Sequence, residues 1–174
     1  GTPEKYTLFI NKVDDCAKAV SDRDIEATVE AERPYPPHPQ LLEVRFLVSG
    51  GYMQRGEEIL SHISKMSLTI PPYLTEYYLL NAKIEASKNN YVEAIHFFDL
   101  AIETGKNQDE HYATEAALLA GDLAYKTGRN DLAMNYWEST FNLYSKKDIY
   151  VDNIQKLAKN HIVKSGLEEK KSNS

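Results

Sequence analysis

Residues 79–101 read LLNAKIEASKNNYVEAIHFFDLA, and this stretch decides the fold of the chain. Apolar residues recur at helical spacing on both sides of a turn-like Asn-Asn pair, so the stretch predicts a hairpin of two helices. The apolar positions are also ordered by size, with Ala82 before the turn, and Ala94 and then Phe98 after it. Because two helices approach closely only where both carry small side chains, we expect Ala82 and Ala94 to mark their crossing and Phe98 to fill the space beyond it.

The same order of small and bulky residues occurs in two other stretches. Residues 41–63 read LLEVRFLVSGGYMQRGEEILSHI and residues 118–140 read LLAGDLAYKTGRNDLAMNYWEST, so equivalent positions are 38 and then 39 residues apart. One hairpin cannot bury both of its faces, so we expect the hairpins to stack, with each bulky residue packed against the next hairpin. The small positions, expected to face each other, are Val44, Ala82 and Gly121 in the first helices and Gly56, Ala94 and Ala133 in the second, and the bulky positions are Leu60, Phe98 and Trp137.

The rest of the chain predicts further helices and almost no strand. Prolines interrupt it at 33–39, which reads RPYPPHP, and again at 70–72. The lone cysteine, Cys16, is expected to be a buried apolar residue of the first helix, and the final EEKKSNS is expected to be disordered. Helices are predicted at 4–20, 24–31, 40–49, 53–66, 74–88, 91–104, 111–126, 131–144 and 149–164.

The hairpin pattern resembles the tetratricopeptide repeat family. The match is carried by the second helices, YVEAIHFFDLAI at 91–102 and NDLAMNYWESTF at 130–141, and about three repeats cover residues 40–144. The resemblance implies an all-α fold of antiparallel helical hairpins stacked as a right-handed α-solenoid with a C-terminal capping helix. The implied organisation is an N-terminal helix pair and Pro-rich connector at 1–39 (a degenerate repeat), three hairpins at 40–147, a capping helix at 148–165 and a disordered tail at 166–174.

The resemblance also implies that the first helix of each hairpin lines a concave face that binds a protein or peptide. The groove on this face would be apolar along one rim, basic at its start and mixed in charge near its end. Such a groove would suit a peptide with apolar anchors and some acidic residues. A chaperone-tail ligand is not expected, because leucines stand where that subfamily has lysine and Arg45, Lys83 and Asp122 stand where it has asparagine. The residues predicted to contact a partner are Leu41, Arg45, Leu79, Lys83, Leu118, Asp122, Tyr125 and Lys126.

The sequence offers no catalytic, metal or cofactor motif, so we expect neither an enzyme nor a bound cofactor. His111 and Glu115 lie four residues apart, which fits an ordinary helix-surface pair better than a metal site. The net charge of −6 argues against direct binding to nucleic acid, and no stretch has the roughly 20 apolar residues of a membrane helix.

The leading functional hypothesis is therefore a non-catalytic scaffold or adaptor module. One alternative is a tetratricopeptide sensor or effector domain of a larger bacterial regulatory protein, membrane-tethered or not. The chain begins Gly-Thr-Pro without Met, which leaves open that it is part of such a protein. Another alternative is a small secretion chaperone with three repeats. The composition is compatible with both cytoplasm and periplasm.

Overall fold

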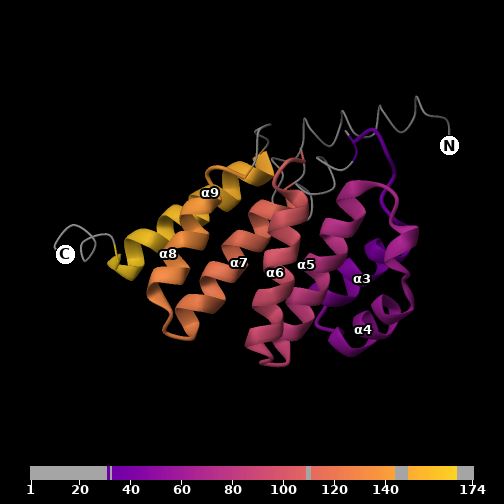
Figure 1. Cartoon of the computed structure of the whole chain (residues 1–174), viewed down its shortest axis with the longest axis horizontal. Coiled ribbons are helices and arrows are strands. Elements are labelled where there is room, and N and C mark those ends of the chain that lie inside the picture. The colour runs from indigo at the N-terminus through magenta and orange to yellow at the C-terminus, as the bar shows by residue number, and fades with distance from the viewer. Residues whose placement is uncertain (1–30, 32, 109–110, 144–148, 168–174) are drawn as a thin grey trace, which may run out of the picture. The chain divides into compact units, whose positions relative to one another are not determined.

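The computed structural model describes residues 31, 33–108, 111–143 and 149–167 (Figure 1). The chain divides into two compact units, Gly1–Pro36 and Pro37–Ser174, and the helices given below belong to the second. The predictions for residues 4–30, which include Cys16, and for 168–174 lie outside the described residues.

The second unit is helical throughout its described part, where no strand occurs, and this confirms the predicted all-α class. A short 3₁₀ helix, η1, covers Lys65–Ser67. The α-helices are α3 (Pro39–Ser49), α4 (Met53–His62), α5 (Pro71–Ser87), α6 (Tyr91–Gly105), α7 (Tyr112–Lys126), α8 (Asn130–Ser139) and α9 (Ile149–Ser165).

Three helix boundaries differ from the predicted ones by more than one residue. Helix α4 ends at His62 rather than at 66, because the buried Ile63 takes an extended backbone conformation. Helix α5 begins at Pro71 rather than at 74, since a proline in the first turn removes only an N–H that would have no partner there. Helix α8 ends at Ser139 rather than at 144, where the buried Thr140 hydroxyl donates to the carbonyl of Trp137 and competes with the helical backbone bond.

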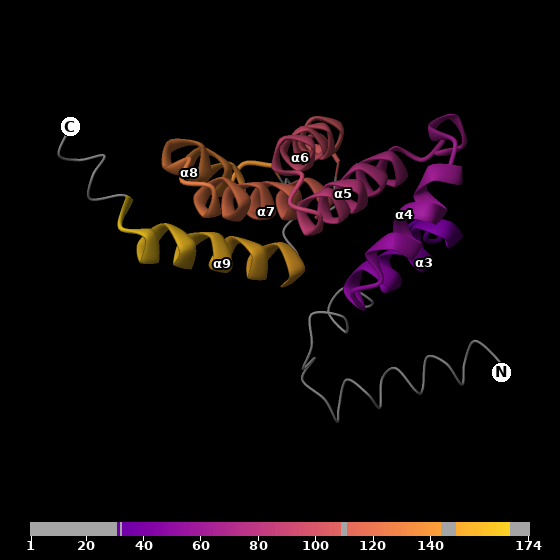
Figure 2. The same ribbon diagram turned by 90° about the horizontal axis from the view of Figure 1, so that it is seen from below.

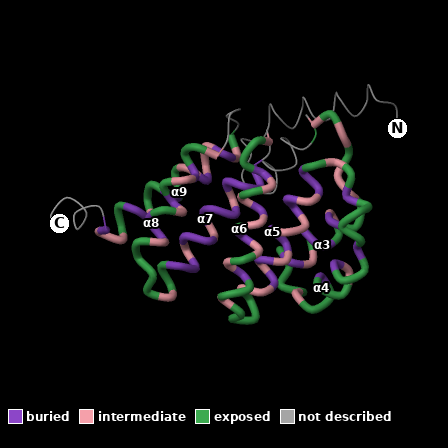
Figure 3. The backbone as a smooth tube through the Cα atoms, in the orientation of Figure 1, coloured by how far each residue is buried: buried purple, intermediate pink, exposed green. Residues whose placement is uncertain are grey.

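Each of these helices contacts its neighbour in sequence, and each odd-numbered helix also contacts the next odd-numbered one. Figure 2 shows α6 and α8 on one side of α5 and α7, with α9 on the other side of α7. Helix α7 is the most enclosed of these, as the long buried stretches in Figure 3 show. Buried residues of neighbouring helices form separate core clusters, one shared by α5, α6 and α7 and another shared by α7, α8 and α9.

The three hairpin turns have the same geometry at equivalent positions. Each contains a residue with a positive φ: Gly51 at 84°, Asn89 at 63° and Gly128 at 78°. The following N–H donates back to a carbonyl near the end of the first helix, which is the Schellman arrangement that ends many helices. These bonds join Tyr52 to Leu47, Asn90 to Glu85 and Arg129 to Ala124, at 2.8, 3.0 and 2.8 Å.

One predicted close crossing, between Val44 and Gly56, is found, and at Gly121 the nearest neighbour differs from the predicted one. A Cβ added to Gly56 would lie 3.5 Å from Val44 Cγ1, so these two positions face each other as expected. A Cβ added to Gly121 would lie 2.4 Å from the Trp137 ring instead. Gly121 therefore gives room to the indole, and the three atoms nearest to the added Cβ belong to Trp137 rather than to Ala133, which was predicted to face it.

Two of the three bulky positions, Phe98 and Trp137, pack against the helix that follows their hairpin, in line with the prediction. Phe98 shares a core cluster with Tyr112 and Leu123 of α7, and Trp137 shares one with Ile154 and Ile162 of α9. Both rings are only 2% exposed. Leu167 belongs to the second cluster as well, so ordered packing extends past residue 166, where the disordered tail was expected to begin.

Candidate functional site

The three leucines predicted to contact a partner are core residues. Leu41, Leu79 and Leu118 are at most 6% exposed. Each opens the repeated block, and each side chain points into the packing between helices rather than to an open rim. A buried side chain offers no apolar edge to a ligand, so these three residues do not belong to a binding surface.

Arg45 links three helices instead of facing a ligand. Its guanidinium donates to Glu76 Oε1 from Nε at 2.8 Å and from Nη2 at 2.6 Å. Nη2 also lies 3.0 Å from the Tyr112 hydroxyl. Both charged side chains are nearly buried, at 11% and 3% exposure, so an ion pair sheltered from solvent joins α3 to α5, and the hydrogen bond to Tyr112 extends the link to α7.

Lys83 repeats this arrangement one hairpin further along. Its ammonium forms an ion pair with Glu115, which joins α5 to α7. Glu76 and Glu115 each stand three residues before the Leu-Leu that opens a repeated block, so both ends of the link recur in register. This recurrence was visible in the sequence and would have assigned Arg45 and Lys83 to contacts between hairpins.

Four of the predicted residues do line hollows on the surface of α5 and α7. The α5–α7 pocket has a volume of about 280 Å³ and an apolar floor with two lysines at its rim. Leu119 and Leu123 come from α7 and Phe98 closes the base from α6. Its lining residues are Lys83, Ala86, Phe98, Leu119, Asp122, Leu123 and Lys126.

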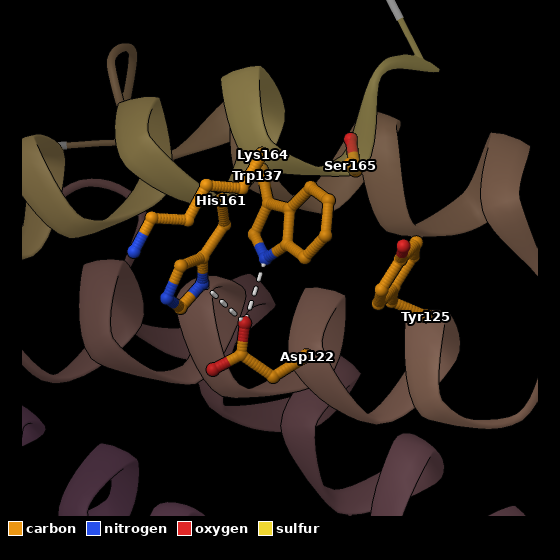
Figure 4. A pocket seen from close by; sticks show the side chains of 6 residues that line it. All are labelled: Asp122, Tyr125, Trp137, His161, Lys164 and Ser165. Carbon is orange, nitrogen blue, oxygen red and sulfur yellow. Dashed lines mark hydrogen bonds and ion pairs between the residues drawn. The ribbon is translucent and has the colours of Figure 1, made fainter.

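The α7–α9 pocket adjoins the first and shares Asp122 with it. Its volume is about 250 Å³, and Figure 4 shows its six lining side chains, Asp122, Tyr125, Trp137, His161, Lys164 and Ser165. Three rings lie close together, with centroid distances of 5.5 Å from Tyr125 to Trp137 and 5.6 Å from Trp137 to His161.

Asp122 organises the polar side of the α7–α9 pocket. Its Oδ1 accepts a hydrogen bond from Trp137 Nε1 at 2.9 Å and lies 2.7 Å from His161 Nδ1 (Figure 4). A carboxylate has no proton to donate, so Nδ1 of His161 carries the hydrogen and Nε2 is the acceptor in the neutral ring. The contact also holds α9 to α7.

In the Asp122–His161 pair a carboxylate orients a histidine, as in the catalytic sites where histidine activates a serine as nucleophile. Such a site would also need a hydroxyl beside His161. Ser165 is the serine that lines this pocket, but its hydroxyl donates to the carbonyl of Ile162. In Figure 4 it lies on the far side of the indole from His161. Across the described ranges, no three His, Cys, Asp or Glu side chains gather as metal ligands would.

Each pocket carries one lysine that has no carboxylate partner among the described residues. Lys126 Nζ lies over the Tyr91 ring, 5.6 Å from its centroid, and borders the α5–α7 pocket. Lys164 borders the α7–α9 pocket. In contrast to the chain's net charge of −6, this surface is locally basic.

Shifted pKa values occur away from the two pockets. Burial raises the pKa of Glu85, but hydrogen bonds from Lys88 and Asn90 outweigh it and leave the pKa below its usual value. Hydrogen bonds to Glu57 and Glu85 raise the pKa of Lys88. The Lys88 ammonium lies 2.6 Å from Glu57 and 2.8 Å from Glu85, so this network ties α4 to α5.

Among the lining residues that sequence reasoning missed are His161 and Lys164. His161 stands 39 residues after Asp122, which is the same step that separates Asp122 from Lys83. The repeat therefore pointed to α9, but this helix lacks the Leu-Leu opening that identified the other hairpins.

Comparison of the chain with known family models, curated proteins and solved structures gave no match. None of the described helices combines the length and the apolar character that crossing a membrane requires.

Proposed function

We propose that the second unit is a non-catalytic interaction module, a scaffold or adaptor that binds a segment of a partner protein across α5, α7 and α9. The proposal includes a right-handed α-solenoid of tetratricopeptide type, capped by α9. Support comes from the contacts between successive odd-numbered helices and from three turns of one geometry at equivalent positions.

The observation that carries the functional proposal is the pair of adjoining pockets. Lys83, Asp122, Tyr125 and Lys126 line them, and these four residues were predicted to contact a partner. Each pocket combines an apolar floor with a few polar groups at the rim, which is the usual composition of a binding site. The binding surface proposed here excludes Arg45 and the three leucines, which hold the hairpins together.

The proposal is tested by selecting displayed random peptides on the whole chain. Ala86 is half-buried and lines the α5–α7 pocket, so Ala86→Phe fills that pocket from within. Val92 is 81% exposed on α6 and lines neither pocket, so Val92→Phe is the matched control. We expect the selected peptides to lose at least about tenfold in affinity for Ala86→Phe and to keep their affinity for Val92→Phe.

Two results would contradict the proposed function. One is a selection that enriches no peptide above a surface without protein. The other is a set of peptides that bind Ala86→Phe as tightly as the wild type. Before affinities are compared, thermal unfolding followed by circular dichroism tests whether both variants remain folded.

A further inference from the structure

The two pockets are equivalent positions of the repeat. A step of 39 residues along the chain relates five of the seven residues that line the α5–α7 pocket to five of the six that line the α7–α9 pocket. In this way Lys83 corresponds to Asp122, Ala86 to Tyr125, Phe98 to Trp137, Asp122 to His161 and Lys126 to Ser165.

This equivalence gives both pockets the same construction. Each lies between two successive odd-numbered helices, and its base is the bulky residue of the even-numbered helix, Phe98 or Trp137. Asp122 belongs to both linings, so the pockets adjoin. A linear ligand that crosses α5, α7 and α9 in that order therefore meets two similar apolar pockets, one after the other.

The distance between the pockets follows from helix packing. Packed helices lie about 8–10 Å apart, so two sites that are one helix apart are separated by about the same distance. An extended polyproline II segment has three residues per turn and rises about 3.1 Å per residue, so residues i and i+3 point to the same side about 9 Å apart. In a β-strand, residues on one face lie about 7 or 13 Å apart, which fits less well.

The charges around the pockets favour an acidic ligand. Lys126 and Lys164, at one pocket each, hold no carboxylate within the described part of the chain. Lys83 and Asp122 are already engaged by Glu115 and His161. A carboxylate beside each apolar anchor would therefore complement a lysine that the fold leaves available.

We propose that the two pockets hold two apolar side chains, three residues apart, of one extended acidic segment of a partner protein. Lys126 and Lys164 each face a carboxylate of that segment. The proposal rests on the proposed function and adds the conformation, the anchor spacing and the charge of the bound segment.

The probe is a short synthetic acidic peptide that contains proline and has two leucines three residues apart. Two comparison peptides have the same composition with the leucines adjacent, or one leucine replaced by serine. Fluorescence anisotropy of a labelled peptide gives the affinity. Trp137 is the one tryptophan of the chain and lines the α7–α9 pocket, so its emission reports occupation of that pocket.

We expect the spaced peptide to bind at least about tenfold more tightly than either comparison peptide. Ala86→Phe should lower its affinity to that of the single-leucine peptide and leave the Trp137 response in place. Lys126→Glu and Lys164→Glu should each weaken binding about three- to tenfold, while Lys159→Glu, on an exposed position of α9 outside both pockets, should not.

The inference is overturned if the adjacent and spaced peptides bind equally, if a helical peptide with leucines seven residues apart binds more tightly, or if Lys159→Glu weakens binding as much as Lys126→Glu. It is also overturned if no peptide of the series binds while the displayed library yields peptides whose binding is abolished by Ala86→Phe. That last result would leave the proposed function standing, whereas failure of the library selection itself removes the proposed function.

Discussion

Two buried glycines on different hairpins, Gly56 and Gly121, differ in the space around them. Gly56 and Gly121 both lie within helices, where alanine is favoured over glycine by about 1 kcal/mol. An added Cβ would meet only ordinary contacts of 3.4 Å or more at Gly56. At Gly121 it would come within 2.4 Å of the indole. The same substitution should therefore have opposite effects at the two positions.

We expect Gly121→Ala to lower the free energy of unfolding by about 1–3 kcal/mol, because the Trp137 ring must move. Gly56→Ala should be neutral or stabilising by up to about 1 kcal/mol. Urea unfolding measures both values, and the emission of Trp137 should change only in Gly121→Ala. Equal free energies for the two variants would show that the indole does not lie on Gly121.

The nearly buried pair of Arg45 and Glu76 should behave as a structural unit. Arg45→Met leaves a carboxylate in the core without its main partner, so we expect a loss of about 3–5 kcal/mol in unfolding free energy. Adding Glu76→Met should recover much of that loss. A double-mutant cycle by urea unfolding gives the coupling, and additive losses would contradict the pairing.

At the scale of helices, Tyr136 connects α8 to α6. Its hydroxyl donates to Asp99 Oδ1 at 2.6 Å. Burial, and then this hydrogen bond to a carboxylate, raise the pKa of Tyr136 above its usual value of 10.0. A raised pKa means that the contact stabilises the fold fully below about pH 10 and that its stabilisation is lost as the pH rises toward the folded-state pKa.

We therefore expect the stability of the wild type to fall more steeply above pH 10 than that of Tyr136→Phe, which has no phenol to ionise there. After allowance for solvent screening of this half-buried group, the difference between about pH 8 and about pH 11 should stay under about 1 kcal/mol. Urea midpoints at the two pH values measure it. Parallel pH profiles for both proteins would mean that the Tyr136–Asp99 bond does not form in solution.

The helices themselves could be predicted from sequence because local residues fix them. The apolar spacing gave their positions, and Gly51, Asn89 and Gly128 are residues that tolerate a positive φ. The ends of α4 and α8 were harder to predict, since they depend on the burial of Ile63 and of Thr140, whose hydroxyl donates to the carbonyl of Trp137. Helix boundaries therefore depend on packing that the periodicity does not contain.

At the scale of the whole second unit, the shared cores predict cooperative unfolding. Phe98 lies between the α5–α6 hairpin and α7, whereas Trp137 lies between α7, α8 and α9. We expect Phe98→Ala to cost about 3–5 kcal/mol and to lower the melting temperature by the same amount in circular dichroism and in Trp137 fluorescence. A fluorescence transition that stays at the wild-type temperature would show that the α7–α9 end unfolds independently.

The candidate site could be predicted only in part, because one residue type serves two roles. A basic side chain at the position of Arg45 suits a ligand as well as a buried carboxylate, and the partner Glu76 lies 31 residues away. Phe46 shows the same limit: it is 61% exposed although the equivalent Ile84 and Leu123 are buried. The side chain of Ile84 faces α4, and within the second unit no helix precedes α3 to cover Phe46 in the same way.

The recurrence of the Lys83–Glu115 link has a consequence for tandem duplication of this segment. A second copy of residues 76–114 inserted in frame before Glu115 would set the copied Glu76 opposite the first Lys83, and the copied Lys83 opposite Glu115. The one new junction would join the buried Thr114 to the copied Glu76 inside a helix, and it would repeat the Thr-Glu pair found at 75–76 and at 114–115. We expect such an elongated protein to fold with unchanged helicity per residue by circular dichroism and to melt no lower than the parent, and a lower melting temperature would mean that the period is not interchangeable.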